Sequence, residues 1–395
     1  MRDLIIFILL IGVVCTVLVD QYLINNYVIL IGLALFFLLG NKSINILAKL
    51  QNKPRDSRLD LPNHEKKSNI PSMGGVLIVS FVVIFSLILC DFVAIRSFLF
   101  LLLGYFFIGL IDDVLKVKKV SKYGFSGKYK LFCEVIVAYC FLYILQLDYG
   151  KWASSTQLRI ADGFSIDIGY WFMPFAILVI VSLANSVNLT DGLDGLVTMP
   201  IIFSLIFIAL IISTNMQDLN EYTDILDRLG VGHIKFTKAE RLRINFQFTN
   251  IRTFVGIVIA GCIGFLFFNK APAKIFMGDC GSLALGGLIG GLAVCCKVEI
   301  LMIIVGFIFL VETLSVIIQV ISFKTRGKRV FKIAPLHHHY EASGFSENFI
   351  VNGFWIISGG TMIMGFLLYF SLWLFFILGF IYCLILLGVI LYSYF

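Results

Sequence analysis

The chain has 395 residues, of which 59% are hydrophobic and 14% are charged, and its formal net charge is +7. Soluble proteins are about 45–50% apolar and about 25% charged, so this composition excludes soluble domains, an intrinsically disordered chain and a collagen. The nine cysteines form no CxxC pair and mostly lie inside apolar runs, which argues against a disulfide-stapled module and a zinc site. The sequence therefore predicts one polytopic membrane protein.

Continuous apolar stretches predict the elements, because a helix needs about 20 apolar residues to cross a bilayer. Ten stretches qualify, at residues 27–48, 74–90, 97–111, 131–147, 170–187, 195–213, 253–268, 281–296, 300–321 and 351–370. We therefore predict an all-α domain of about ten transmembrane helices over residues 27–370.

Apolar sequence also lies outside this domain. Residues 1–26 contain an apolar run, Leu4 to Val19, without an A-x-A cleavage site. We interpret it as an uncleaved segment lying in the membrane interface, with a signal-like segment or a short span as the alternatives. Residues 371–395 form an extra hydrophobic segment that is long enough to be a further span.

The positions of Lys and Arg predict the orientation. Connections that follow odd-numbered spans carry twenty of these residues, and connections that follow even-numbered spans carry ten. The positive-inside rule places the odd connections in the cytoplasm. The basic segment from Thr214 to Arg252 follows an even-numbered span and weakens this contrast, but it also holds five acids, and long loops follow the rule poorly.

Every unusual polar cluster lies in or beside an odd connection, so we expect all of them on one membrane face. The clusters are His64–Lys67 with Pro71–Gly75, Asp112-Asp113 with Lys116, Ser126–Lys130, Asn188–Gly195, Phe276–Asp279 and His337–Glu341. Transporters tend to place functional polar groups near the bilayer midplane. Clusters at helix ends on one side favour an enzyme whose active site lies at the cytoplasmic helix ends.

Asp112 and Asp113 end an apolar helix. Carboxylates at that depth are costly and need cationic partners or a metal. Adjacent carboxylates favour Mg²⁺, which bridges to substrate phosphates, while one of the pair can instead act as a general base. Lys116 shares a helix face with Asp112, so an ion pair at a solvated helix end is the simpler alternative.

Glycine-rich acidic segments follow two other spans. In Asn188–Gly195, Asp191 and Asp194 lie among glycines that let the backbone approach a ligand closely. Ribose, a nucleobase or a metal would suit these carboxylates, and a capped turn between helices is the alternative. Asp279 beside Gly278 is either a site residue or an ordinary helix N-cap.

Basic and histidine residues on the same face complete the candidate site. The lysines are Lys66, Lys67, Lys116, Lys128 and Lys130; they either hold a di- or polyphosphate or only set the topology on anionic lipid. Neighbouring histidines cannot all face one metal ion, so His337–His339 favour phosphate contacts and orientation of a carboxylate, or form a polar loop. Glu312 lies inside a span and is a weaker candidate. The sequence has no P-loop and no GxGxxG, and nothing supports nucleic-acid binding.

Together these motifs resemble the phospho-N-acetylmuramoyl-pentapeptide transferase family, within the polyprenyl-phosphate N-acetylhexosamine-1-phosphate transferase superfamily. The resemblance runs from about residue 28 to 370 and includes Ala334–Glu341, with its three histidines, which points to the peptidoglycan branch. It departs from the family pattern at Asn69–Ser72, where Gly-Thr-Pro-Thr is usual, in a segment near Thr214–Arg252 that looks longer than usual, and in the apolar tail after Ser371.

The resemblance implies ten helices in the bacterial cytoplasmic (inner) membrane and a Mg²⁺-dependent active site facing the cytoplasm. UDP-N-acetylmuramoyl-pentapeptide would donate its phospho-sugar to undecaprenyl phosphate, forming UMP and the first lipid-linked peptidoglycan precursor, lipid I. A sister enzyme using UDP-N-acetylglucosamine is the alternative, and a cation transporter is a distant one. Direct attack and a two-step path through an aspartyl phosphate both stay open, as does the oligomeric state, for which a homodimer is one option.

The resemblance also implies residue roles. Asp279 matches the metal ligand and Asp112 the base. Other catalytic positions are Asp113, Lys116, Lys128, Asn188, Asp191, His337, His338 and His339. Substrate-binding positions are Lys67, Gly192, Leu193, Asp194, Asn269 and Phe276, of which Gly192, Leu193, Asp194 and Phe276 match a uridine pocket.

Overall fold

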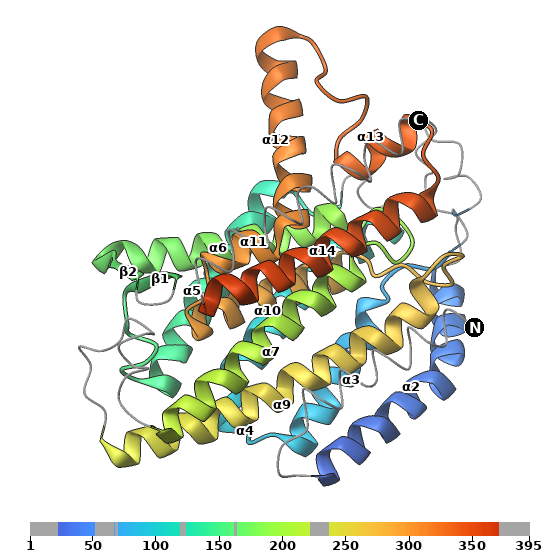
Figure 1. Ribbon diagram of the computed structural model, residues 1–395. Helices are drawn as coiled ribbons and strands as arrows, with labels where there is room; N and C mark the ends of the chain where they lie inside the picture. The colour runs from blue at the N-terminus through green and yellow to red at the C-terminus, as the bar shows by residue number, and fades with distance from the viewer. Residues whose placement is uncertain are drawn as a thin grey trace.

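A computed structural model describes residues 23–51, 67, 70–118, 124–161, 164–221 and 237–370, and helices dominate it (Figure 1). The helices are α2 (Leu23–Leu50), α3 (Gly75–Leu89), α4 (Phe92–Val117), α5 (Gly127–Tyr149), α6 (Phe172–Thr190), α7 (Thr198–Glu221), α9 (Lys238–Asn269), α10 (Asp279–Cys296), α11 (Leu301–Val305), α12 (Phe307–Arg326), α13 (Leu336–Ala342) and α14 (Glu347–Phe370). Predictions for residues 1–22 and 371–395 lie outside the described residues.

The prediction of an all-α membrane protein is confirmed. Each of the ten predicted spans falls on helical sequence. Within the described ranges, eight helices are long and apolar enough to cross a membrane, and two shorter apolar helices cover Gly75–Leu89 and Thr198–Thr214. The chain is therefore a multi-pass membrane protein.

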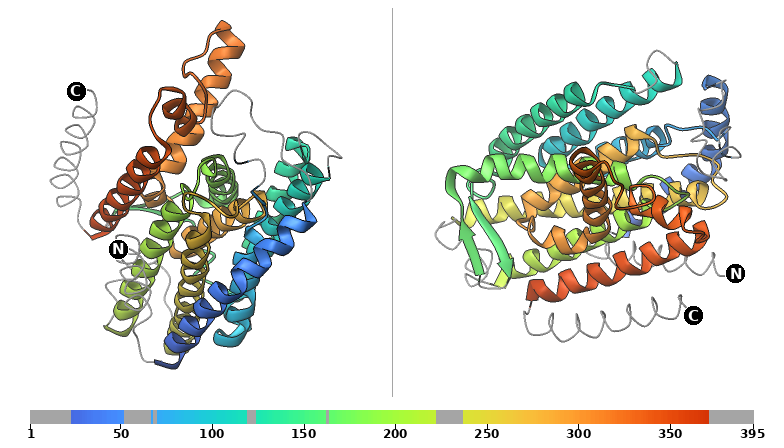
Figure 2. Two further views of the ribbon diagram at one scale, coloured as in Figure 1. Left: turned by 90° about the vertical axis from the view of Figure 1, so that its right-hand side faces the viewer. Right: turned by 90° about the horizontal axis from the view of Figure 1, so that it is seen from above.

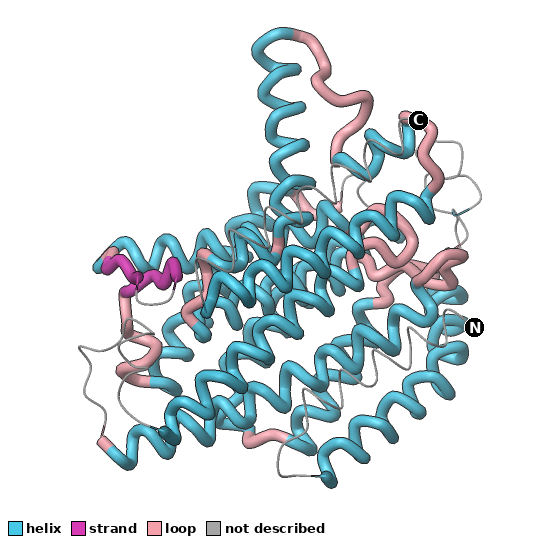
Figure 3. Tube along the Cα trace, viewed as in Figure 1, coloured by secondary structure: helices cyan, strands magenta, loops and turns pink. Residues whose placement is uncertain are grey.

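Two local expectations were wrong, and one small element was not expected. The ninth span, predicted as continuous over 300–321, is divided into α11 and α12 at Gly306. The segment 214–252 is not simply a long loop, since α7 continues to Glu221 and α9 begins at Lys238, where Thr237 and Glu240 form a capping box. Strands β1 (Gln157–Ala161) and β2 (Phe164–Asp167) form an antiparallel hairpin before the 3-10 turn η2 (Gly169–Trp171), shown in magenta in Figure 3.

Helix α10 forms the centre of the bundle. All of its residues after Asp279 are buried. Small residues allow close helix packing where lipid supplies no hydrophobic driving force: an added Cβ at Gly286 would lie 2.8 Å from Cα of Ala184 on α6, and one at Gly287 would lie 2.9 Å from the ring of Tyr105 on α4. This packing fixes the first residue of α10, Asp279, relative to both neighbours.

Connections of the same parity meet at the same end of the bundle. At one end, Asn250 accepts a hydrogen bond from the backbone of Asp91 at 2.7 Å, and Lys297 Nζ donates to Ser155 O at 2.8 Å. At the other end, Gln51 Nε2 donates to Ser72 O at 2.8 Å, and the backbone nitrogen of Gly74 donates to Phe276 O at 2.8 Å. The second end carries the polar motifs.

Helix α12 leaves the bundle after the break at Gly306. Figures 1 and 2 show it projecting away from the other helices. Its side chains Ile317, Ile321 and Phe323 are exposed, as expected for a membrane-spanning helix in lipid. The chain then returns through residues 327–335 to α13, which brings the three histidines back towards the bundle.

Candidate active site

Two lysines and two aspartates from α4, α5 and α10 form the acidic–basic cluster. Lys116 Nζ lies 2.5 Å from Asp112 and 3.1 Å from Asp279. Lys130 Nζ lies 2.8 Å from Asp279 and 3.8 Å from Asp112. The Asp112 side chain is 3% exposed and also accepts a hydrogen bond from the backbone of Phe125 at 2.6 Å. Both carboxylates are therefore held by the same two ammonium groups.

Asp113 and the glycines around Asp279 fix the geometry of this cluster. The Asp113 carboxylate accepts the backbone N–H of Cys280 at 3.0 Å, at the start of α10. Gly278 has a φ of 75°, and an added Cβ would lie 2.6 Å from that carboxylate, so only glycine fits there. The Asp113 carboxylate thus supports the turn that presents Asp279.

The segment Pro71–Gly75 packs directly behind this turn. Backbone hydrogen bonds of 2.8–2.9 Å join Pro71 and Gly74 to Phe276, and Gly75 to Met277. An added Cβ at Gly75 would overlap the backbone of Gly281. The predicted motifs 71–75 and 276–279, about 200 residues apart in sequence, are therefore one structural unit.

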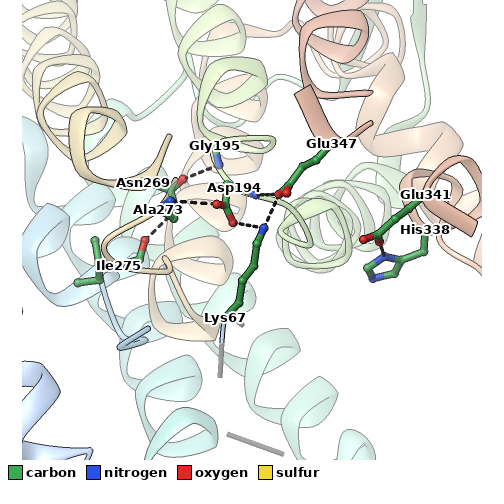
Figure 4. A network of polar contacts seen from close by, with 9 residues as sticks. All are labelled: Lys67, Asp194, Gly195, Asn269, Ala273, Ile275, His338, Glu341 and Glu347. Carbon is green, nitrogen blue, oxygen red and sulfur yellow. Dashed lines mark hydrogen bonds and ion pairs between the residues drawn. The ribbon is translucent and has the colours of Figure 1, made fainter. Parts of the chain in front are cut away.

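A second cluster joins Lys67, Asp194 and Glu347 (Figure 4). Lys67 Nζ lies 2.7 Å from Asp194 Oδ1 and 2.6 Å from Glu347 Oε1. Asp194 Oδ2 accepts the backbone N–H of Ala273 at 2.9 Å. Burial lowers the pKa of Lys67, but the hydrogen bonds and charges of Asp194 and Glu347 outweigh it, and its net pKa lies above the ordinary value. Lys67 is therefore a cation held by two carboxylates.

The histidine segment lies beside the loop that follows α6. His337 is buried against Glu312 of α12, and an added Cβ at Gly192 would overlap Nε2 of His337. His338 Nδ1 lies 3.1 Å from Glu341 Oε2, and the His339 Nδ1 accepts the backbone N–H of Lys332 at 3.2 Å. The three rings thus have different partners, as expected for neighbours that cannot share one ion.

The acidic–basic cluster resembles an open site for a divalent cation more than a closed structural metal centre. Among the described residues, no three His, Cys, Asp or Glu side chains are grouped as metal ligands. Mg²⁺ needs only one or two protein carboxylates when substrate phosphates supply other ligands. Asp279 has a partly exposed carboxylate (17%) of the type that Mg²⁺ binds, but its Oδ2 is paired here with the ammonium groups of Lys116 and Lys130, so an ion would have to replace these pairs.

Comparison with known proteins decides the family. A family model described as glycosyl transferase family 4 matches residues 95–297, and one described as phospho-N-acetylmuramoyl-pentapeptide-transferase signature 1 matches residues 67–79. A phospho-N-acetylmuramoyl-pentapeptide-transferase of Rickettsia bellii (strain RML369-C) is 40% identical over 340 residues, 85% of this chain and 89% of the relative. The chain belongs to this family.

A relative from another bacterial genus gives the same result. The phospho-N-acetylmuramoyl-pentapeptide-transferase of Halalkalibacterium halodurans is 40% identical over 318 residues, which cover 79% of this chain and 86% of the relative. The signature match begins at Lys67 and includes the Pro71–Gly75 segment. The glycosyl transferase match contains Asp112, Lys130 and Asp279. The acidic–basic cluster, Lys67 and Asp194 therefore lie inside sequence matched by the family models, whereas Glu347 lies outside both matches.

The structure does not bring every predicted site residue into these contacts. Lys128 is exposed, whereas Lys130, two residues later, reaches the carboxylates. Asn269 uses both ends of its amide within the protein: Oδ1 accepts from Gly195 N and Thr198 Oγ1, and Nδ2 donates to Ile275 O. Its position fits a brace for the loop after α6. Residues 64–66 lie outside the described part of the chain.

The remaining predicted residues line the same end of the bundle. Asn188 and Asp191 are half-buried at the end of α6, and the backbone N–H of Asp191 donates to Asn188 O at 3.2 Å. Leu193 is 5% exposed. Phe276 is half-buried in the strand-like contact with Pro71 and Gly74. Their roles towards substrate stay predictions.

The structure adds contacts for three residues that the predicted site did not include: Glu347, Glu312 and Lys130. Glu347 was absent from the predicted site, although it is an acid at the first turn of a span that follows the histidines. Glu312 was ranked low, yet it contacts His337. Lys130 was grouped with the other lysines but not selected. A helical-face argument could have separated Lys130 from Lys128, since residues two apart on a helix do not share a face.

Proposed function

We propose that this chain transfers phospho-N-acetylmuramoyl-pentapeptide from UDP-N-acetylmuramoyl-pentapeptide to undecaprenyl phosphate, releasing UMP and forming lipid I in peptidoglycan synthesis. The observation that carries the proposal is the placement of Asp279 between Lys116 and Lys130, beside Asp112. Phosphoryl transfer depends mainly on positioning and neutralisation of charge, and this cluster supplies both at a helix end that a lipid phosphate can reach.

In this proposal, an oxygen of the lipid phosphate attacks the sugar-proximal phosphorus of the donor. The new P–O bond forms as the bond to the UMP oxygen breaks, and UMP leaves with the electron pair. Lys116 and Lys130 neutralise charge on the phosphoryl oxygens. Asp112, held by Lys116 and by the backbone of Phe125, accepts any proton that the lipid phosphate carries.

Asp279 is the residue proposed to hold Mg²⁺. When bound, the ion would act as a Lewis acid and neutralise charge on the phosphoryl oxygens. The support is the donor set: a partly exposed carboxylate at the start of α10, with Asp112 sharing its two lysine partners. Asp113 would act indirectly, since its carboxylate holds the α10 turn.

The donor nucleotide is proposed to bind beside Lys67. Gly192, Leu193, Asp194 and Phe276 would form the pocket for uridine, with Lys67 at its edge. Support comes from the contacts that draw three separate segments together at this point, through Asp194, Ala273 and Glu347. His337 and His338 would contact phosphates from the opposite side of the loop after α6.

We propose that the site faces the cytoplasm of a bacterial inner membrane. The UDP-linked donor is a soluble anion, and the odd connections that surround the site carry twenty of the Lys and Arg residues against ten elsewhere. Cysteine labelling in a cysteine-free background tests this: single cysteines at Gly327 and Ser126 should react only with reagents that enter the cell. Reaction from outside would reverse the orientation.

The decisive experiment is a transfer assay with purified protein, radiolabelled UDP-N-acetylmuramoyl-pentapeptide, undecaprenyl phosphate and Mg²⁺. We expect labelled lipid to form and EDTA to stop it. A parallel assay with UDP-N-acetylglucosamine tests the sister activity, and reaction of that sugar alone would refute the proposal. UMP exchange without the lipid acceptor would support a two-step path, and its absence would favour direct attack.

A further inference from the structure

Glu347, the first residue of α14, reaches from the C-terminal part of the chain into the second cluster. Its Oε1 accepts two hydrogen bonds, from Lys67 Nζ at 2.6 Å and from the backbone nitrogen of Asp194 at 3.0 Å. The Glu347 side chain is 17% exposed and that of Lys67 is 22% exposed. One carboxylate oxygen therefore fixes both a side chain and a backbone group (Figure 4).

The other bonds in this cluster make the role of Glu347 specific. Asp194 shares its carboxylate between Lys67 and the backbone of Ala273, so it ties Lys67 to the α9–α10 connection. Glu347 ties the same ammonium to α14. A lysine side chain is long and flexible, and its ammonium group has no preferred direction of its own. Two carboxylates on different elements hold the ammonium group in one direction.

Removing Glu347 would leave Asp194 as the remaining acid bound to Lys67 among the described residues. The ammonium could then pivot about a single contact. At the same time the backbone N–H of Asp194, at 3.0 Å from Glu347, would lose its acceptor, which loosens the loop after α6. Both changes fall at the predicted nucleotide pocket, while Lys116, Lys130, Asp112 and Asp279 keep their contacts with one another.

We propose that Glu347 is a positioning residue for donor binding, which holds the Lys67 ammonium and the Asp194 backbone in the arrangement that the UDP moiety meets. This inference rests on the proposed function. It assigns Glu347 an effect on the affinity for the nucleotide and none on the phosphoryl transfer step, because Glu347 has no contact with Asp112, Lys130 or Asp279.

A kinetic comparison of four variants tests this role: Glu347→Gln, Glu347→Asp, Lys67→Gln and the double variant Glu347→Gln/Lys67→Gln. Hydrogen bonds to charged groups contribute enough for a loss of about 10-fold or more. We expect Glu347→Gln to raise the donor KM and the inhibition constant of UMP about 10-fold. The kcat and the KM for undecaprenyl phosphate should stay within about twofold. Glu347→Asp should restore part of the loss.

The double variant shows whether Glu347 acts through Lys67 or stabilises the structure independently of it. If Glu347 acts through Lys67, adding Glu347→Gln to Lys67→Gln should change the donor KM by less than about twofold. Full additivity, or a fall in kcat without a change in donor KM, would overturn the inference. Glu240→Gln is the matched control: Glu240 also lies in the first turn of a helix and pairs with a lysine, Lys151, at 3.1 Å, but at the other end of the bundle.

The outcomes also separate this inference from the proposed function. If the wild-type protein does not transfer the phospho-sugar, the proposed function fails. If it does, and Glu347→Gln binds UMP as tightly as the wild type, only the role of Glu347 fails. UMP binding measured by calorimetry on the full chain gives this second result without turnover, and the conservative Glu347→Asp variant serves if Glu347→Gln does not fold.

Discussion

Glu312 holds His337 by two atoms at once. Its Oε2 lies 3.0 Å from His337 Nδ1, and its Oε1 accepts the backbone N–H of the same histidine at 3.1 Å. Both side chains are almost completely buried. A carboxylate oxygen at Nδ1 accepts the proton there and orients the ring, so Nε2 is the ring nitrogen left for a substrate group. Nε2 faces Gly192 and has no hydrogen-bond partner among the described residues.

This contact predicts the effect of replacing Glu312. Glu312→Gln keeps the shape but can no longer fix the His337 tautomer, so we expect kcat to fall roughly 10- to 100-fold, the range seen when a residue that orients a functional histidine is lost. Steady-state kinetics with melting temperature as a control measure it. A variant with wild-type kcat would show that the tautomer of His337 does not matter.

Asp279 is expected to be indispensable. Asp279→Ala removes the proposed metal ligand and leaves Lys116 and Lys130 with one fewer partner, so activity should be abolished. Residual turnover should respond weakly to added Mg²⁺. A Mg²⁺ titration of wild-type and variant protein is the measurement, and normal turnover in the variant would remove the metal assignment.

The two lysines of α5 are expected to differ. Lys130 contacts Asp279 at 2.8 Å, whereas Lys128 is exposed. Loss of a charge-assisted contact to a reacting phosphate costs on the order of 100-fold. Lys130→Gln should therefore lower kcat about 100-fold, and Lys128→Gln should have a much smaller effect. Equal losses at both positions would mean that substrate binding draws Lys128 into the site.

The alkaline limit of donor binding should move to lower pH when Glu347 is replaced. The pKa of Lys67 is raised in the folded protein. The contribution of its charge to the stability of the folded pocket is therefore complete below the unfolded pKa of about 10.4, and it is lost as pH rises through the higher folded pKa. Glu347→Gln removes one raising contribution, while burial still lowers the pKa. The alkaline limb of donor kcat/KM should shift to lower pH in this variant, and an unshifted profile would contradict it.

Close packing at the glycines predicts a stability difference. Gly75→Ala would push a methyl group into the backbone of Gly281, whereas an added Cβ at Gly353 on α14 meets nothing within 4 Å. Overpacking of this kind costs about 1–3 kcal/mol. Thermal unfolding in detergent should show a lower melting temperature for Gly75→Ala and little change for Gly353→Ala. Equal melting temperatures would mean that α3 can move away from α10.

The sequence was most informative where the physics is local. Apolar runs of bilayer length predict the spans. Counting whether each motif follows an odd- or an even-numbered span then groups the motifs at one end of the bundle, because this needs only the order of the spans along the chain. The break at Gly306 was not predictable in this way, because residues 300–321 are apolar on both sides of it. The strands of the hairpin at 157–167 are likewise too short to be recognised from the sequence pattern.

Pairings between distant residues were the harder part. Lys67, Asp194 and Glu347 are up to 280 residues apart, and nothing in their local sequence indicates that they meet. Asn269 shows the opposite problem: its residue type suits a ligand contact, but tertiary structure commits its amide to Gly195, Thr198 and Ile275. The type and spacing of residues indicate which chemistry a site can carry out, whereas the contacts between those residues are set by the tertiary fold.

The glycine contacts behind Asp279 bear on drug resistance. At Gly75 and Gly109 an added side-chain atom would overlap the backbone of Gly281 and of Asp279 itself. A microbe cannot easily alter such positions without losing the enzyme. These glycines are buried, so they are not themselves a binding surface, but they hold Asp279 in place. An inhibitor contact to Asp279 would therefore be hard to escape by mutation of the residues behind it, whereas a contact to the exposed Lys128 has no such constraint.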